Sequence, residues 1–136
     1  MSENVGFAGQ IGPEHVGQVV EKGFKSIINN RPDMEGGPEQ PTSAQIEEAA
    51  RQAGLDYVYQ PVVAGQITEL DVRTFANHYN ELPKPVLMFC RTGNRSNNLY
   101  SVHDKFHRTL ILSGFCLLKI AKISLNSSFF PKPIKR

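Results

Sequence analysis

Short apolar runs alternate with helix-like stretches along the first 90 residues of the chain. Four runs are predicted to be buried strands: 7–10, 24–28, 56–60 and 86–89. Three stretches between them repeat apolar residues at helical spacing: 13–23, 43–54 and 68–82. Such alternation predicts an α/β fold, one domain with a central, mainly parallel sheet of four or five strands flanked by helices.

The polar segments that follow the predicted strands carry most of the candidate reactive and ligand-binding residues. A helix is also expected after the fourth strand, starting at Ser96 or Asn97. In a parallel sheet the segments after the carboxyl ends of the strands share one edge, where ligands bind. Residues 29–33, 61–68 and 90–95 are therefore expected to converge there.

The segment CRTGNRS, residues 90–96, follows the most apolar strand and precedes the expected helix. Successive backbone N–H groups in such a bend form an anion-binding nest, here made by Arg91, Thr92, Gly93 and Asn94. A helix N-terminus adds partial positive charge, which favours the thiolate of Cys90. We therefore expect an oxyanion site with a reactive cysteine.

Two arginines and a serine complete the predicted loop. The Arg95 guanidinium can donate to two oxygens of one oxyanion. Arg91 can do the same or pair with an acid on a neighbouring loop. The Ser96 hydroxyl can bond to the sulfur or cap the helix.

Three separated motifs resemble the beta-lactamase-hydrolase-like, phosphatase-like family of the cysteine-phosphatase fold: INNRPDMEG (28–36), YQPV (59–62) and CRTGNRS (90–96). The likeness covers about residues 5–100, with 101–136 as an atypical C-terminal segment. It implies that Cys90 is the nucleophile, that Arg95 and the loop amides bind the oxyanion, and that Asn30, Arg31 and Asp33 line the same pocket. The family includes both sulfur transferases and phosphatases.

The spacing of the loop favours sulfur transfer. Four residues separate Cys90 from Arg95, whereas cysteine phosphatases typically have five. The shorter loop resembles rhodanese loops, and Phe89 stands where most such phosphatases have His. A rhodanese-like sulfurtransferase that forms a persulfide on Cys90 is therefore favoured. The alternatives are a phosphate-monoester hydrolase acting through a phosphocysteine and an inactive domain that binds anions or a partner.

A phosphatase also needs an acid to protonate its leaving group. Relatives can carry an Asp near the position of Gln66, and this chain has no Asp there. Glu69 and Asp71 are predicted first-turn residues that complement the helix dipole. Asp33 is interpreted either as the acid or as a turn residue after Pro32.

The charge distribution changes after residue 100. Residues 1–100 carry 8 Lys/Arg and 12 Asp/Glu, a net of −4, while 101–136 carry 7 Lys/Arg and one acid, a net of +6. Composition shifts at the same point, and helical periodicity is weak. We hypothesise that an ancestral reading frame was lost near residue 100, which would truncate the helix after the loop.

Other classes of function find little support in the sequence. The scattered basic charges match no nucleic-acid-binding motif, and no apolar run is long enough to span a membrane. Without a signal peptide, a cytoplasmic location is predicted. We expect no cofactor and no metal site, since His15 and His78 lack partners at ligand spacing. Cys116 is expected to be a small apolar residue, and the expected partners are a small anionic sulfur donor or phosphoester, with a thiol acceptor for sulfur transfer.

Overall fold

The computed structural model describes residues 4–113, with side chains as far as His107. Strands and helices alternate along the chain. The strands are β1 (Val5–Ala8), β2 (Ser26–Asn29), β3 (Asp56–Tyr59) and β4 (Val86–Phe89). The helices are α1 (Val16–Glu21), preceded by a 3-10 turn (Pro13–His15), α2 (Ser43–Gln52), α3 (Glu69–Glu81) and α4 (Asn94–Ser113).

The four strands of the described residues form one parallel sheet in the order β1-β4-β2-β3. The predicted α/β fold is therefore confirmed. Ala8, Asn29 and Phe89 stand in register at the carboxyl ends of neighbouring strands. Because β4 lies between β1 and β2, its loop emerges at a switch in strand order, where parallel sheets bind ligands.

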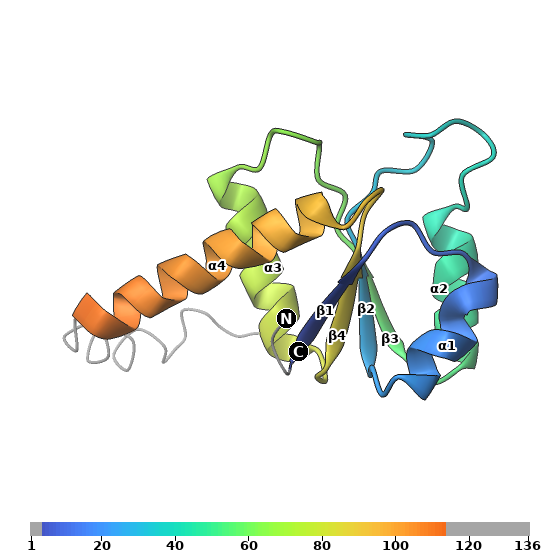
Figure 1. Cartoon of the computed structure of the whole chain (residues 1–136), viewed down its shortest axis with the longest axis horizontal. Coiled ribbons are helices and arrows are strands. Elements are labelled where there is room, and N and C mark those ends of the chain that lie inside the picture. Colours follow the sequence, from blue (N-terminus) through green and yellow to red (C-terminus); the bar gives the residue numbers. More distant parts are fainter. Residues whose placement is uncertain (1–3, 114–136) are drawn as a thin grey trace. The chain divides into compact units, whose positions relative to one another are not determined.

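Two apolar layers cover the two faces of the sheet (Figure 1). On one face α1 and α2 pack over Ile27 and Leu87, and their buried residues include Val16, Val19 and Ile46. On the other face Phe75 of α3 and Leu99 of α4 pack over Ile28 and Met88. β4 is buried along its whole length, as its apolar sequence predicts.

Capping residues set the starts of α2 and α3. The Thr42 hydroxyl accepts a hydrogen bond from the Gln45 N–H, and the Thr68 hydroxyl accepts one from the Asp71 N–H. In each case the side chain of the third helical residue bonds back to the N–H of the capping threonine. Asp71 thus has a local structural role, as expected for a first-turn acid.

Two predicted boundaries differ from the structure. β1 spans Val5–Ala8 instead of 7–10, because Gly9 already lies against the loop after β4. α4 starts at Asn94, before the predicted Ser96 or Asn97, and continues to Ser113. No glycine or proline interrupts residues 94–113, so the backbone keeps its helical hydrogen bonds.

The residues up to Tyr100 form one compact unit, and Ser101 begins a second. All contacts discussed below lie within the first unit. None of the helices in the described part of the chain is long and apolar enough to span a membrane. Cys116 and most of the segment with the reading-frame hypothesis lie outside the described residues.

Candidate functional site

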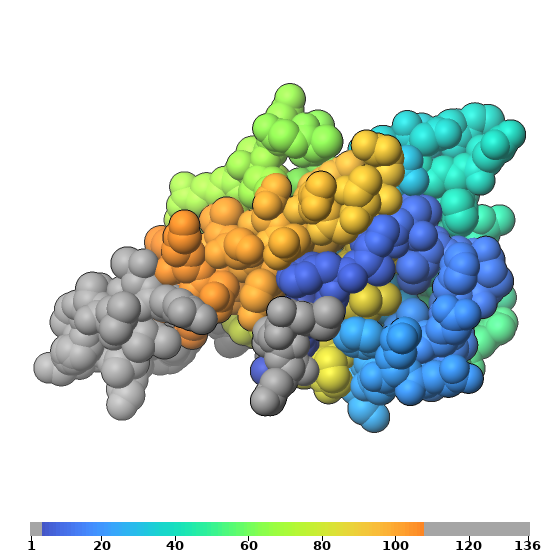
Figure 2. Space-filling model, in the orientation of Figure 1, coloured from blue at the N-terminus to red at the C-terminus, as the bar shows by residue number. Residues whose placement is uncertain are grey.

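Three loops converge at the carboxyl edge of the sheet, as the strand alternation predicts. They follow β2, β3 and β4, and they lie at one end of the sheet in the ribbon view (Figure 1). The space-filling view shows the same three segments at that end, in cyan, green and yellow (Figure 2). Hydrogen bonds join them: the Asn30 carbonyl accepts from the Val62 N–H, and the Phe89 carbonyl accepts from the Asn30 N–H.

The loop after β4 is held tightly against the end of β1. The Cys90 N–H donates to the Ala8 carbonyl, and the Gln10 N–H donates to the Arg91 carbonyl. Gly93 has a φ of +96°, and a Cβ there would lie 3.3 Å from the Ala8 carbonyl oxygen. Glycine is therefore required at position 93 for both its backbone conformation and its packing.

Cys90 lies at the base of this loop and is almost wholly buried. Its Sγ accepts a hydrogen bond from the Gly93 N–H at 3.1 Å. Burial raises the pKa of the Cys90 thiol, but the N–H groups of Ser96, Thr92 and Gly93 outweigh it, so the pKa falls below its ordinary value. The backbone of the loop therefore favours the thiolate.

Asn30 connects the three loops from beneath the site. Its side chain is fully buried, its Nδ2 donates to the Gln60 carbonyl, and its Oδ1 accepts from the Ser96 hydroxyl at 2.7 Å. The Ser96 hydroxyl also lies close enough to lower the pKa of Cys90.

Arg95 extends from the first turn of α4 across the site. Its side chain is 9% exposed. Nη1 donates to the Val62 carbonyl at 3.0 Å, and the guanidinium forms an ion pair with Glu35 at 3.1 Å. The Nε of Arg95 is buried and makes no hydrogen bond with the described residues. Arg95 is therefore fixed at its outer end while its Nε–H remains unused by the described residues.

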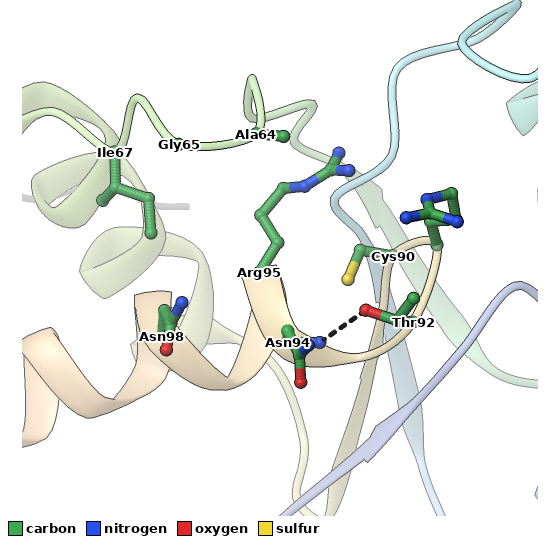
Figure 3. Close-up of a pocket in the computed structure, with 9 residues that line it drawn as sticks. Ala64, Gly65, Ile67, Cys90, Thr92, Asn94, Arg95 and Asn98 are labelled. Carbon is green, nitrogen blue, oxygen red and sulfur yellow. Dashed lines mark hydrogen bonds between the residues drawn. The ribbon is translucent and has the colours of Figure 1, made fainter.

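A pocket of about 490 Å³ opens above Cys90. Figure 3 shows the Cys90 thiol and the Arg95 side chain on one side of the space and the backbone of Ala64 and Gly65 above it. Ile67 and Asn98 lie farther along the same pocket. The lining thus combines a thiol and two guanidinium groups with small and apolar residues, a composition that suits a compact anion with an organic group attached.

The structure brings most of the predicted site residues together. Cys90, Arg91, Thr92, Asn94 and Arg95 line the pocket. Gly93, Ser96 and Asn30 support it through the contacts described above.

Two predicted residues are placed elsewhere. The Asp33 carboxylate accepts a hydrogen bond from the Ser43 N–H, at the first residue of α2, and is not part of the pocket lining. The Arg31 guanidinium lies behind the site, where it bonds to Glu35 and Gln10. The contacts of Asp33 fit its interpretation as a structural residue better than that of an acid.

Glu35 is a site residue that the sequence did not indicate by its own pattern. It bonds to both Arg31 and Arg95, although Arg95 lies 60 residues away in the sequence. Burial raises the pKa of Glu35, but the two arginines lower it by more, so the pKa of Glu35 falls below its ordinary value. Its position four residues after Arg31 was the only local signal. In the described part of the chain, no three His, Cys, Asp or Glu side chains gather as a metal site would require.

Comparison with known proteins places this site in a family. A beta-lactamase hydrolase-like protein of Agrobacterium fabrum is 41% identical over 100 residues, covering 74% of this chain and 23% of the relative. One from Xylella fastidiosa is 35% identical over 104 residues, covering 76% of this chain and 24% of the relative. The chain therefore spans about a quarter of the length of these curated relatives.

Solved structures agree on the fold. A putative phosphatase from Neisseria meningitidis superposes with a TM-score of 0.70 at 34% identity, covering 89% of this chain and 81% of the other. TpbA of P. aeruginosa, solved in complex with pTyr, superposes with a TM-score of 0.53 at 16% identity, covering 90% of this chain and 68% of the other. At that identity TpbA supports the fold alone.

A family model matches residues 1–106 of the chain, which include all three loops of the site. The match covers the motifs around Asn30, Gln60 and Cys90. The chain belongs to the family of phosphatase-like domains of beta-lactamase hydrolase-like proteins.

Proposed function

We propose that this domain hydrolyses phosphate monoesters with Cys90 as the nucleophile. The observation that carries the proposal is a buried thiol of lowered pKa at the base of a pocket that two arginines line. The phosphatase-like family and the Neisseria neighbour support phosphoryl transfer. We therefore place hydrolysis ahead of sulfur transfer, which the loop spacing favours.

The reaction would proceed in two displacements. The Cys90 thiolate attacks phosphorus, the P–S bond forms, and the P–O bond to the leaving group breaks with both electrons going to the oxygen. Water then attacks phosphorus, the P–S bond breaks, the thiolate is restored and a proton is released to solvent. Arg95 and the loop N–H groups would stabilise the charge on the phosphoryl oxygens in both steps.

Sulfur transfer is a second candidate, and the four-residue spacing between Cys90 and Arg95 favours it. In that reaction the thiolate attacks the outer sulfur of a donor such as thiosulfate. An S–S bond forms on Cys90, and sulfite leaves with the electron pair of the broken bond. An acceptor thiolate would then take the outer sulfur and restore the Cys90 thiolate.

One comparison separates these chemistries. The purified protein is assayed with an aryl phosphate, chosen because a neighbour binds phosphotyrosine. In parallel, it is incubated with thiosulfate and Cys90 is examined by mass spectrometry for the mass of one added sulfur atom. Phosphate release that is lost in Cys90→Ser supports hydrolysis. A persulfide on Cys90 without phosphate release supports sulfur transfer.

The remaining outcomes also decide the question. Phosphate release that survives in Cys90→Ser removes Cys90 from the mechanism and overturns the proposal. A folded protein with neither reaction, tested over a range of pH, supports a domain that only binds anions or a partner. Glu39→Gln is the control for effects of substitution and purification that do not involve the site, because this exposed side chain lies in the loop after β2 but outside the pocket lining.

A further inference from the structure

Glu35 and Arg95 form an ion pair that joins two of the three loops. Glu35 Oε2 lies 3.1 Å from Arg95 Nη1, and Oε1 lies 3.1 Å from Arg95 Nη2. Each carboxylate oxygen therefore faces one terminal nitrogen of the guanidinium. This parallel arrangement fixes both the position and the plane of the guanidinium.

The donors of Arg95 can be counted, because a guanidinium has five N–H groups. The two on Nη1 point to Glu35 and to the carbonyls of Val62 and Asn30. One on Nη2 points to Glu35, and the Nε–H makes no hydrogen bond within the part of the chain that the structure describes. With the terminal edge occupied, Nε and the second N–H of Nη2 are left, and these two donors lie side by side and parallel.

Two parallel donors match two oxygens of a tetrahedral anion. Arg95 lines the same pocket as Cys90, and its buried Nε has no partner among residues 4–107, whose side chains the structure describes. An anion attacked by Cys90 would supply the missing acceptor. The orientation of the guanidinium thus determines whether the two unused donors meet such an anion.

We propose that Glu35 is a positioning residue, which holds the Arg95 guanidinium so that its Nε and Nη2 donors face an oxyanion bound above Cys90. This inference rests on the proposed function of the site. Glu35 does not touch the anion in this arrangement, and it acts only through Arg95.

Arg31 and Gly36 hold Glu35 in turn. Arg31 Nε donates to Glu35 Oε1 at 2.8 Å, and Arg31 Nη1 donates to Gln10 at 2.9 Å. A Cβ at Gly36 would lie 2.6 Å from Arg31 Nη2, so glycine at 36 leaves room for Arg31. The Arg31 side chain is 10% exposed and that of Glu35 is 26% exposed, which makes this pair better ordered than a surface ion pair.

The test uses Glu35→Gln, which keeps the shape of the side chain and removes its charge, with Glu39→Gln as the matched control. In a Cys90→Ser background, inorganic phosphate binding is measured by calorimetry. We expect Glu35→Gln to weaken phosphate binding about 10- to 100-fold, because a small misplacement of a binding group has effects of that size. Glu39→Gln should leave the affinity and the melting temperature unchanged.

A double-mutant cycle with Arg95→Ala shows whether Glu35 acts through Arg95. In the Arg95→Ala background the second change, Glu35→Gln, should have no further effect on phosphate affinity. Equal losses in both backgrounds would overturn the inference, as would full affinity in Glu35→Gln alone. Turnover of an aryl phosphate that depends on Cys90 but not on Glu35 would overturn only the inference, whereas absence of Cys90-dependent turnover overturns the proposed function.

A measurement without ligand covers the case in which phosphate does not bind. The Arg95 Nε–H is followed by NMR in the free protein. With Glu35 present, its signal should be sharp and its exchange with solvent slow, and Glu35→Gln should broaden it or speed its exchange. An Arg95 Nε–H signal that is unchanged in Glu35→Gln would show that Glu35 does not hold Arg95.

Discussion

Two of the three loops at the site hold their functional groups in different ways. The loop after β4 holds the Cys90 thiol with its own backbone, through the N–H groups of nearby residues. The loop after β2 holds Arg95 and Ser96 with side chains, through Glu35 and Asn30, which lie 60 and 66 residues away in sequence. A backbone site depends on conformation, whereas a side-chain site depends on the identity of single residues.

The largest effect is expected at Asn30, in the loop after β2, which holds its partners with side chains (the side-chain region). Asn30→Ala removes the partners of the Gln60 carbonyl and the Ser96 hydroxyl, both in the buried network. Leaving two buried polar groups unsatisfied at about 1–3 kcal/mol each should lower the free energy of unfolding by ~2–6 kcal/mol. Urea unfolding measures this change, and a loss as small as that of a surface substitution would show that Asn30 does not join the loops.

Gly93→Ala tests the loop after β4, which holds Cys90 with backbone N–H groups (the backbone region). Position 93 has a φ of +96°, and the new Cβ would approach the Ala8 carbonyl to 3.3 Å. A residue forced into such a conformation costs about 1–3 kcal/mol, and here it would also displace the N–H that bonds to Cys90 Sγ. Stability and Cys90 reactivity should fall together. Gly37→Ala is the control, because φ is +96° there too, but it lies in the loop after β2 with open space around it.

The backbone loop was also the part that the sequence could predict. Its residues are contiguous, so the order Cys90, Gly93, Arg95 within six residues indicates both the bend and the oxyanion chemistry. The strands and helices followed from apolar periodicity for the same reason, since that signal is local. The start of α4 was misplaced because the Gly93 carbonyl already accepts the first helical bond from Asn97, and β1 was placed two residues too late.

The side-chain region could not be predicted in the same way. The family motif drew attention to residues 28–36, but nothing local shows that Glu35 pairs with Arg95 or that Asn30 bonds to Ser96. Asp33 was interpreted as either a candidate acid or a turn residue, and nothing local indicated that its carboxylate accepts a hydrogen bond from the Ser43 N–H, at the start of α2. Contacts between distant side chains require the register of the sheet, which one sequence does not specify.

The pH dependence of thiol alkylation gives a smaller and more specific test of the backbone region. Thiolate reacts with iodoacetamide, so the rate rises with pH as Cys90 loses its proton. The midpoint should lie below 9.0, the ordinary value of the thiol, because the loop N–H groups lower the pKa of Cys90. Reactivity is then present above the lowered pKa and is lost as the pH falls through it.

Ser96→Ala sharpens the same measurement. The Ser96 hydroxyl lowers the pKa of Cys90 less than the backbone N–H groups do, and the substitution keeps the N–H of residue 96. The midpoint should therefore rise slightly and stay below the ordinary thiol value. A midpoint at or above that ordinary value would show that the side chain, and not the backbone, stabilises the thiolate.

The smallest effect is expected from Thr92→Val, which changes a side chain within the backbone region. The Thr92 hydroxyl accepts a hydrogen bond from the Asn94 N–H at 3.3 Å, near the start of α4, while the Thr92 N–H contributes to the low pKa of Cys90. Valine keeps the size and the N–H, so the alkylation midpoint should not move. The free energy of unfolding should fall by about 0.5–1 kcal/mol for the lost capping bond. A shift of the midpoint as large as that from Ser96→Ala would mean that side chains hold the thiol as they hold Arg95, and the two loops would no longer differ.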